Sequence, residues 1–456
     1  MFNIKTDSRK VKAGDIFVAL KTPLSSGEKY IEDAIKAGAT TIVAQSGSYS
    51  VNTIIVDDTR EYLENYLKLN YNKYIEKMKI VGITGTNGKT TIAYLINQAL
   101  NLNNIKSAYL GTVGFYMNDY IEETNNSTPD ICDLYEYLMK AYENNIEYFI
   151  MEVSSHALAL RRVETITFDT CIFTNLTQDH LDFHGTMENY MKAKQKLFFK
   201  LKENGLAIVN KDDKYSKNFI LSFNNNILYS IKDIKEYKIE KDSMTFELNI
   251  NNKYYNFKTN LIGKFNLYNL NAVIKFLSYI NIDINRIINT IENLIPPKGR
   301  VDIINFNTNK IIIDYAHTPD AIEKIIDVAN DLKYKNLYIV FGCTGCRDKS
   351  KRPIMGRIVS ENATRFIITN DDVYTEDPID IVKDIEKGIK YNNYSVILNR
   401  YEAIKEGISY LKRNDILMIL GKGHENVMKL NNKRIHFNDK ECVLEIINEI
   451  EKRSVT

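Results

Sequence analysis

The stretch MKIVGITGTNGKTT, residues 78–91, decides the fold of this chain. Its short apolar run, Ile80 to Ile83, predicts a buried strand, and the apolar-periodic segment Ile92 to Leu102 predicts a helix. The turn between them contains two glycines and leads into a lysine and two threonines: Gly85, Thr86, Asn87, Gly88, Lys89, Thr90 and Thr91. A strand, a glycine turn and a helix N-terminus in this order form a cradle for phosphate.

The residue types in this turn fit that interpretation. Backbone N–H groups and the helix dipole would face the anion, Lys89 adds a positive charge, and Thr90 can offer its hydroxyl to Mg²⁺. The general phosphate-loop pattern has a glycine where this chain has Ile83, so the sequence carries a shorter form, GTNGKT. The alternative is a chance glycine turn, and the strand-to-helix context argues against it.

The composition is that of an ordinary globular protein. The chain has 456 residues, of which 44% are hydrophobic and 26% charged, and its net charge of +2 gives no field that would attract nucleic acid. No apolar run approaches the roughly 20 residues that span a bilayer, and the N-terminus lacks the apolar core of a signal peptide. The five scattered cysteines suit free thiols in a reducing compartment. We therefore expect a cytoplasmic protein with no nucleic-acid and no membrane partner.

The chain divides into three predicted domains of the α/β class. Residues 1–76 form a small α/β domain, with strands at Asp15–Leu20 and Thr41–Val43 and a helix at Tyr30–Ala37. Residues 77–297 form a central parallel sheet of the phosphate-loop type with an antiparallel extension. Residues 298–456 follow a Pro-Pro-Lys-Gly linker and form a Rossmann-like domain. Its five predicted strands are Lys310–Ile313, Leu337–Phe341, Ala363–Thr369, Ser395–Leu398 and Asp415–Leu420.

The antiparallel extension rests on residues 205–260, where Ala207–Val209, Ile227–Tyr229 and Met244–Ile250 alternate like antiparallel strands. A helix, Leu270–Tyr279, closes the central block. It is entered through the segment Phe265-Asn266-Leu267-Tyr268-Asn269.

Polar side chains follow the buried strands of the central block. Glu152 follows the strand Tyr148–Met151, and His180 follows the strand Thr170–Phe173. Because residues past the carboxyl ends of parallel strands line the ligand crevice, we expect Lys89, Thr90, Glu152 and His180 at one edge of the sheet. Five of the six histidines lie in such loops, which favours a functional site there.

These residues suit Mg²⁺-nucleotide chemistry, and they leave three classes open. One is a kinase or ATPase, the second is an ATP-dependent ligase, and the third is a nucleotide-controlled binding protein. Three domains that meet at one crevice favour the ligase, which must hold three substrates.

Seven motifs, in order along nearly the whole chain, resemble those of the Mur ligase family. They are TGTNGKTT (84–91), EVSSHAL (152–158), TNLTQDHLDFHGTMENYMKAK (174–194), GKFNLYN (263–269), DYAHTPD (314–320), FGCTGCRDKSKRP (341–353) and GKGHE (421–425). The resemblance is greatest to the MurE branch, the UDP-N-acetylmuramoyl-L-alanyl-D-glutamate–amino-acid ligases of peptidoglycan synthesis. It implies a monomeric enzyme that joins a small diamino acid to the UDP-MurNAc-dipeptide through an acyl phosphate.

The resemblance also implies roles for individual residues. Lys89, Glu152, His180 and Lys194 would be the catalytic residues, with ATP and two Mg²⁺ ions as cofactors. Thr90, Glu152, His180 and a carbamylated Lys194 would hold the metals, and Asn269, Arg300 and Asp314 the adenosine. Contacts to the UDP-sugar and dipeptide would come from Asp7, Ser8, Arg9, Ser127, Thr128, Ser154 and Arg162. The incoming amino acid would meet Arg347, Asp371, Asp372, Gly421 and Glu425.

The sequence departs from the family at the amino-acid end and at the UDP-sugar end. Family members that select meso-diaminopimelate have Asp-Asn-Pro-Arg where this chain has Asp371-Asp372-Val373-Tyr374. Tyr374 cannot form the charged pair of that arginine, and two aspartates would attract an ammonium group, so we expect L-lysine, with diaminopimelate second. Leu160 and the segment 26–29 also differ from the usual residues. A family paralogue with another acyl substrate is therefore an alternative.

Overall fold

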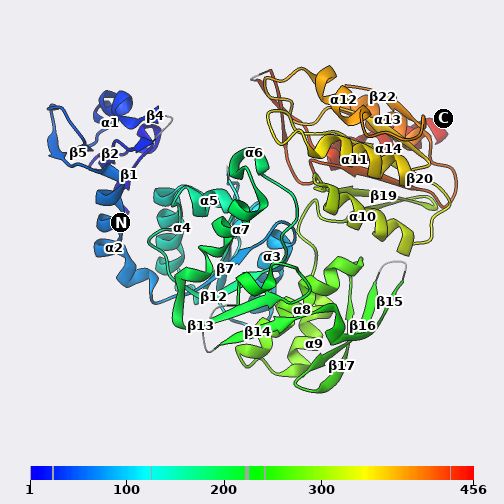
Figure 1. Ribbon diagram of the computed structural model, residues 1–456, viewed down its shortest axis with the longest axis horizontal. Coiled ribbons are helices and arrows are strands. Elements are labelled where there is room, and N and C mark those ends of the chain that lie inside the picture. Colours follow the sequence, from blue (N-terminus) through cyan, green and yellow to red (C-terminus); the bar gives the residue numbers. More distant parts are fainter. Residues whose placement is uncertain are drawn as a thin grey trace.

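The computed structural model describes residues 2–22, 25–124, 126–220, 225–240, 243–431 and 433–455. It has the three-domain α/β architecture expected from the sequence (Figure 1). The first residues form a small lobe, a large sheet lies at the centre, and the C-terminal residues form a second α/β lobe. The exact domain limits stay a prediction.

The N-terminal lobe contains a four-stranded sheet in the order β1-β2-β5-β6, and every neighbouring pair is parallel. The long helix α2 had no counterpart in the sequence analysis. Asp58 caps it by accepting from the N–H groups of Arg60 and Glu61 at 2.8 and 3.1 Å. The elements of this lobe are β1 (Ile4–Lys5), η1 (Ser8–Lys10), β2 (Ile16–Val18), β3 (Lys21–Thr22), β4 (Ser25–Ser26), η2 (Gly27–Tyr30), α1 (Ile31–Lys36), β5 (Thr41–Ala44), β6 (Asn52–Ile55) and α2 (Thr59–Ile75).

The central sheet has the order β10-β9-β8-β11-β7-β12-β13-β14. The six strands from β8 to β14 in this order are parallel. At one edge, β9 pairs antiparallel with β8, and β10 pairs antiparallel with β9. The strands are β7 (Lys79–Thr84), β8 (Ser107–Gly111), β9 (Gly114–Met117), β10 (Tyr120–Glu122), β11 (Tyr148–Glu152), β12 (Phe168–Phe173), β13 (Leu201–Asn210) and β14 (Asn226–Tyr229). The helical elements around them are α3 (Lys89–Leu102), α4 (Ile131–Glu143), α5 (Ser155–Ala159), α6 (Leu181–His184), α7 (Met187–Gln195), η3 (Phe198–Lys200), η4 (Ser216–Asn218), η5 (Ile231–Asp233), α8 (Lys264–Tyr279) and α9 (Ile284–Asn293).

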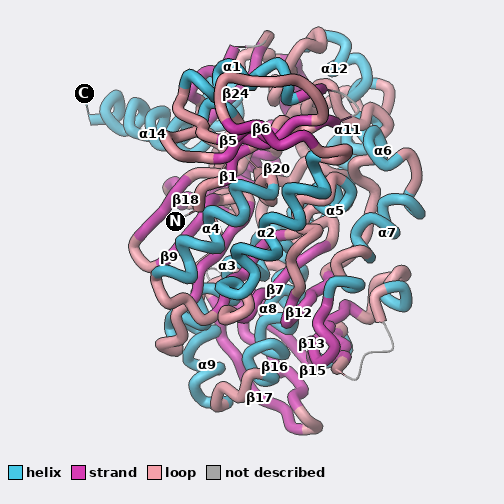
Figure 2. The backbone as a smooth tube through the Cα atoms, turned by 90° about the vertical axis from the view of Figure 1, so that its left-hand side faces the viewer, coloured by secondary structure: helices cyan, strands magenta, loops and turns pink. Residues whose placement is uncertain are grey.

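Alternate residues of β7 separate the two hydrophobic layers of this sheet. Val81 and Ile83 pack in the layer that contains α3 and α8. Ile80 packs in the layer on the other side, with α2 and α4, which lie side by side (Figure 2). A strand buried on both faces reads as the continuous apolar run seen in the sequence, and it leaves only its carboxyl end for chemistry.

Two of the three strands expected to be antiparallel are parallel instead. Ala207–Val209 and Ile227–Tyr229 lie in β13 and β14, which extend the central sheet. The end of β13, residues 205–210, is buried without interruption, as expected for a parallel strand that is covered on both faces. The separate antiparallel sheet consists of β15 (Ile234–Ile239), β16 (Met244–Ile250) and β17 (Lys253–Thr259), and burial alternates along β16 as expected.

The C-terminal lobe has a six-stranded sheet in the order β18-β19-β23-β20-β21-β22, and all five predicted strands are present. In this sheet β18 alone runs antiparallel to its neighbour, and the other pairs are parallel. The sequence analysis missed β18 and the hairpin β24-β25. Its elements are β18 (Asp302–Phe306), β19 (Asn309–Asp314), α10 (Pro319–Asp331), β20 (Leu337–Phe341), α11 (Lys351–Asn362), β21 (Arg365–Ile368), α12 (Pro378–Glu386), β22 (Tyr394–Val396), α13 (Arg400–Ser409), β23 (Ile416–Leu420), β24 (Val427–Leu430), β25 (Lys433–His436) and α14 (Asp439–Val455).

Two boundaries matter for the site. Glu152 is the last residue of β11 and does not follow it, and α8 begins at Lys264, so Asn269 lies within the helix. Across the described ranges, no helix has the length and apolar character needed to cross a membrane.

Candidate active site

The phosphate loop joins β7 to α3 as predicted. Gly88 is the N-cap of α3 with φ of +87°, and no side chain caps the helix there, so its first N–H groups remain available to an anion. A Cβ at Gly88 would lie 2.7 Å from Asn269 Oδ1, and a Cβ at Gly85 would collide with Thr174 Oγ1. The loop therefore requires both glycines, and Asn269 lies directly against it.

Glu152 is fully buried and is held by four donors. Its Oε1 accepts from Tyr109 Oη and from the Thr112 N–H, both at 2.7 Å. Its Oε2 accepts from Thr90 Oγ1 at 2.9 Å and from Thr112 Oγ1 at 3.1 Å. These contacts place the Glu152 and Thr90 oxygens side by side at the start of α3.

Two lysines meet on the other side of the loop, at a single carbonyl. Lys89 Nζ donates to Gly85 O at 2.9 Å and to Thr86 O at 2.8 Å, and Lys194 Nζ donates to the same Gly85 O at 2.7 Å. Lys194 is 1% exposed. Burial, and then the nearby Lys89, lower the pKa of Lys194 well below its usual value. Burial also lowers the pKa of Lys89, which the charges of Glu152 and Asp179 partly offset.

His180 lies on the same side, as the N-cap of α6, with φ of +54°. Burial lowers its pKa to about 3, although the neighbouring Asp179 opposes the shift, so the imidazole is neutral at pH 7. A neutral ring can accept a metal ion, whereas an imidazolium cannot.

Asp179 connects the central sheet to the C-terminal lobe. Its carboxylate lies 3.3 Å from His180 Nε2, 4.0 Å from His317 Nε2 and 3.7 Å from Lys351 Nζ. Burial alone would raise the pKa of Asp179, but His180 and Lys351 outweigh it and hold the pKa below its usual range. Two further hydrogen bonds join the central domain to the C-terminal lobe. Asn87 Nδ2 donates to Asp320 Oδ2 at 2.6 Å, and Gln178 Nε2 donates to Ser350 Oγ at 3.0 Å.

The linker brings Arg300 to the phosphate loop. Its guanidinium lies over the Tyr315 ring at 4.8 Å, and Nη2 donates to Thr90 Oγ1 at 3.3 Å. Its buried Nε has no hydrogen-bond partner in the described structure. Asp314, at the end of β19, accepts from the N–H groups of Val301 and Ala316, both at 2.8 Å. Arg300 therefore has donors left for an anionic ligand.

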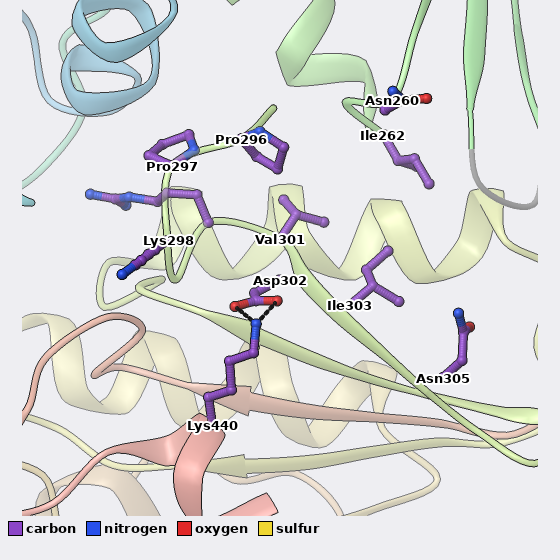
Figure 3. Close-up of a pocket in the computed structure, with 11 residues that line it drawn as sticks. Asn260, Ile262, Pro296, Pro297, Lys298, Val301, Asp302, Ile303, Asn305 and Lys440 are labelled. Carbon is purple, nitrogen blue, oxygen red and sulfur yellow. Dashed lines mark hydrogen bonds and ion pairs between the residues drawn. The ribbon is translucent and has the colours of Figure 1, made fainter. Parts of the chain in front are cut away.

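A pocket of about 460 Å³ opens beside the same linker (Figure 3). Pro296, Pro297 and Val301 give it apolar walls. Arg300 also lines it. Lys440 pairs with Asp302 at 2.9 Å within it.

The residues assigned to the dipeptide form one cluster at the end of β11. Thr128 Oγ1 donates to Glu152 O at 2.8 Å and accepts from the Ser154 N–H at 3.0 Å. Arg162 donates to Thr128 O at 2.9 Å and pairs with Asp130 at 2.8 Å, and the half-buried Ser127 precedes Thr128.

The turn Asp7-Ser8-Arg9 lies apart from this cluster, in the N-terminal lobe. Asp7 accepts from the Arg9 side chain at 2.9 and 2.7 Å. Lys10, beside the turn, pairs with Asp133 of α4 at 2.7 Å. The turn therefore faces the same helix end as the dipeptide cluster, and not the phosphate loop.

Four of the five residues assigned to the amino acid, Asp371, Asp372, Gly421 and Glu425, lie around Lys422, and Arg347 lies near the Tyr374 ring. Lys422 Nζ lies 3.0 Å from Asp372 Oδ1 and 2.7 Å from Glu425 Oε2, and a Cβ at Gly421 would lie 2.6 Å from Asp371 Oδ2. Asp371 and Asp372 are each 4% exposed. Burial alone would raise the pKa of Asp371, but Lys422 and Arg400 lower it.

This arrangement differs from the expectation for the two aspartates. The sequence analysis has them attract the distal ammonium of a ligand. In the structure a lysine of the same lobe already neutralises Asp372, and both carboxylates are removed from the surface.

Sequence reasoning missed Tyr109, Thr112, Asp179 and Lys422. Three of them follow the rule used for Glu152 and His180, because they lie in segments just past β8, β12 and β23. Asp179 and Lys422 even lie within the quoted motifs. Tyr109 is buried inside β8, and nothing in its sequence context marks it.

The residues present fit Mg²⁺ bound together with a nucleotide. In the ranges that the structure describes, no group of three or more His, Cys, Asp or Glu side chains is placed to hold a metal by itself. Mg²⁺ usually takes one or two protein oxygens and completes its shell with phosphate and water. Glu152 and Thr90 supply two such oxygens beside the phosphate loop.

Comparison with known proteins gives one result along the chain. Residues 2–98 match the catalytic domain of the Mur ligase family, residues 83–277 the Mur ligase middle domain, and residues 299–423 the Mur ligase glutamate ligase domain. The UDP-N-acetylmuramoyl-L-alanyl-D-glutamate–2,6-diaminopimelate ligase 1 of Clostridium acetobutylicum is 38% identical over 98% of this chain and 95% of its own length. The corresponding ligase of Fusobacterium nucleatum is 39% identical over 96% of this chain and 92% of its own length.

Solved structures give the same result. A UDP-N-acetylmuramoyl-L-alanyl-D-glutamate–2,6-diaminopimelate ligase, 30% identical, superposes with a TM-score of 0.67 over 99% of this chain and 95% of its own. The MurF ligase of Thermotoga maritima in complex with ADP has a TM-score of 0.71 at 18% identity, over 99% and 98% of the two chains, and this likeness shows the fold.

The phosphate loop lies at the carboxyl ends of a parallel sheet, and a second α/β lobe contacts it there. This arrangement defines a three-domain nucleotide-dependent enzyme. The chain belongs to the Mur ligase family, and it is an ATP-dependent ligase of the MurE type.

Proposed function

We propose that this ligase joins a diamino acid to the D-glutamate of UDP-MurNAc-L-Ala-D-Glu, a step in the synthesis of peptidoglycan precursors. The observation that carries the proposal is the meeting of the central sheet, the linker and the C-terminal lobe at the phosphate loop. Thr90 touches Glu152 of the central sheet and Arg300 of the linker, and Asn87 bonds to Asp320 of the C-terminal lobe. We propose that a nucleotide held at this point would direct its γ-phosphate towards the residues assigned to the acceptor and to the amino acid.

The proposed reaction has two steps. A carboxylate oxygen of the acceptor attacks the γ-phosphorus of ATP, the bond to the β-phosphate oxygen breaks, and ADP leaves. The amine nitrogen of the incoming amino acid then attacks the acyl carbon, loses a proton, and expels phosphate. The C-terminal lobe, closed over the central sheet, would keep water away from the acyl phosphate, which water would otherwise hydrolyse.

The first step joins two anions, so the site must offset their repulsion. Lys89 and Arg300 carry positive charge beside the loop, and the free N–H groups at the start of α3 add to it. Mg²⁺, which Glu152 and Thr90 would hold, neutralises phosphate charge when it is bound.

Lys194 is proposed to carry a carbamate. The lowered pKa of Lys194 favours a neutral amine, which is the form that adds to CO₂ with loss of one proton. The product would turn a buried cation beside Lys89 into an anion and supply a further oxygen for a second Mg²⁺. His180, neutral at pH 7, is proposed as its neighbour in the metal site.

For the amino acid, we propose meso-diaminopimelate, with L-lysine as the second candidate. The expectation of L-lysine depended on free carboxylates at Asp371 and Asp372, and both are buried and beside Lys422. The most similar ligases described above are named for 2,6-diaminopimelate. The incoming amino acid would meet Arg347, Gly421 and Glu425, with its α-amine at Glu425.

The remaining assignments are proposals of the same kind. The domain limits are residues 1–76, 77–297 and 298–456. Asp7, Ser8 and Arg9 would meet the UDP moiety and Asn269, Arg300 and Asp314 the adenosine. Substrates of this kind place the reaction in the cytoplasm. The protein is proposed to act as a monomer.

A phosphate-release assay tests the function. The purified protein is given Mg²⁺-ATP with the UDP-MurNAc-dipeptide and single amino acids, each alone and together. The proposal expects phosphate release only when acceptor and amino acid are both present. Release with neither would indicate an ATPase, and release with an acceptor of different chemistry would indicate a paralogue.

A further inference from the structure

A cationic cluster lies at the position where this chain lacks the arginine of the Asp-Asn-Pro-Arg motif. It consists of Lys429, Arg347 and Tyr374, and we name it the Tyr374 cluster. Lys429 Nζ lies 3.3 Å from Tyr374 Oη and 5.2 Å from the centroid of its ring. The Arg347 guanidinium lies 5.8 Å from the same centroid. Two cations from different segments therefore share one aromatic ring.

The backbone fixes this meeting. Tyr374 and Leu430 form an isolated parallel bridge. The Tyr374 N–H donates to Lys429 O at 3.2 Å, and the Asn431 N–H donates to Tyr374 O at 2.8 Å. These bonds attach β24 to the loop after β21, so the side chain of Lys429 is placed beside Tyr374 by register and not by chance.

The charge of the cluster is in excess. The acidic group nearest to Lys429 is Asp372, whose Oδ2 lies 3.4 Å from Nζ. Asp372 is already committed, because its Oδ1 accepts from Lys422 Nζ at 3.0 Å and from the backbone N–H of Lys429 at 2.9 Å. Arg347 stacks on the Tyr374 ring, and no acidic side chain of the described residues forms an ion pair with it. Lys429 thus has only a carboxylate that it shares with Lys422, and Lys422 also pairs with Glu425.

The cluster is open on the side where a ligand would arrive. The Lys429 side chain is 32% exposed, whereas that of Asp372 is 6% exposed. Arg347 is exposed, and the next residue, Asp348, contacts Gln178 of the central sheet at 3.4 Å. Although burial opposes it, the hydrogen bond to Tyr374 raises the pKa of Lys429, so the ammonium is charged at neutral pH.

Contacts connect the Tyr374 cluster to the residues assigned to the α-amino acid end. Lys422 lies between Glu425 and Asp372, and Asp372 lies between Lys422 and Lys429. A ligand whose amine approaches Glu425 would therefore extend its far end towards Lys429. We propose that Lys429, with Arg347 near the same Tyr374 ring, is a specificity-determining residue that binds the distal carboxylate of the incoming amino acid. This inference rests on the proposed ligase function.

The chemistry of the far end follows from the charges. A carboxylate accepts hydrogen bonds from an ammonium and from a guanidinium, and such charge-assisted bonds are the stronger kind. An ammonium in the same place would meet two like charges. The cluster therefore favours a diamino dicarboxylic acid over a diamino acid with an uncharged or cationic end.

The test measures kcat and KM with meso-diaminopimelate and with L-lysine for the wild type and three variants. Lys429→Met removes the charge, Lys429→Arg keeps it, and Lys433→Met changes an exposed lysine of the same hairpin as a matched control. For Lys429→Met we expect kcat/KM for meso-diaminopimelate to fall about 10- to 100-fold, as for loss of one charge-assisted hydrogen bond. Most of the change should lie in KM, and KM for ATP and for the UDP-linked acceptor should stay the same. Lys429→Arg should retain the activity, and Lys433→Met should match the wild type.

Several outcomes would overturn the inference. One is a Lys429→Met enzyme that keeps its kcat/KM for meso-diaminopimelate within about 2-fold of the wild type. Another is a variant that loses meso-diaminopimelate and L-lysine equally, and a third is a wild type that uses L-lysine in preference. If Lys429→Met fails to fold, the same comparison is made with the exposed Arg347→Met. A wild type that ligates neither amino acid contradicts the proposed function itself, which separates that failure from failure of the inference.

Discussion

Replacing Tyr109 with phenylalanine should destabilise the central sheet without disturbing its packing. Tyr109 is fully buried, and its hydroxyl donates to Glu152 Oε1 at 2.7 Å. Burial, and then the charge of Glu152, raise the pKa of Tyr109 well above its usual value, so the hydroxyl keeps the proton that it donates. The change removes one of four donors from a buried carboxylate.

A hydrogen bond to a charged group contributes about 1.5–3 kcal/mol to the free energy of unfolding. For a domain of about 150–250 residues, such as the central one, a loss of about 1 kcal/mol in the free energy of unfolding lowers the melting temperature by roughly 2–4 °C. We therefore expect Tyr109→Phe to lower the Tm by roughly 3–12 °C in scanning calorimetry. Tyr94→Phe is the control, because the Tyr94 ring meets the Tyr109 ring edge-on at 5.7 Å but donates no bond to Glu152. A Tyr109→Phe protein that melts within about 1 °C of the wild type would refute the role given to this hydroxyl.

Three further predictions concern the phosphate loop and its surroundings. Lys194→Ala should reduce ligation below detection, with partial return of activity on addition of a short-chain carboxylic acid, and unchanged turnover would contradict the carbamate. Arg300→Ala should raise KM for ATP about 10-fold, because it removes a charge-assisted contact beside Thr90; Arg365→Ala, which removes the same kind of stacking on Tyr410 far from the site, should not. The free energy of unfolding should fall as the pH drops from 7 towards 4. Burial lowers the pKa of His424 to about 4 in the folded state, whereas the unfolded chain takes up this proton near pH 6.5. Between these two pH values protonation therefore favours the unfolded state. Urea titrations at pH 7, 6, 5 and 4 should show a smaller fall in the free energy of unfolding for His424→Gln than for the wild type. An equal fall in both proteins would contradict the role given to His424.

The sequence was sufficient wherever one local rule decided the structure. The two glycines of the phosphate loop, the apolar run before them and the periodic helix after them predict β7 and α3, and both are present. The rule that residues past parallel strands share one edge places Glu152 beside Thr90, and the two side chains are bonded. Strands β11 and β12 also pair directly with β7, one on each side.

Other features depend on long-range contacts that local patterns do not contain. The pairing of β13 and β14 is decided by the helices that cover them, so their short alternating runs gave the wrong orientation. The donors of Glu152 come from β8, α3 and the loop after β8, and only the assembled sheet brings Tyr109 to the carboxylate. Asp371 and Asp372 look free in the sequence because Lys422 is about 50 residues further on.

The central claim is that the acceptor carboxylate attacks ATP directly. It is tested by supplying the UDP-MurNAc-dipeptide with ¹⁸O in the carboxylate that is ligated, together with unlabelled ATP and the amino acid, and by recording the mass of the released phosphate. An acyl-phosphate route transfers one ¹⁸O atom from the substrate to each phosphate. Unlabelled phosphate, formed at the same rate as the amide product, would contradict the account.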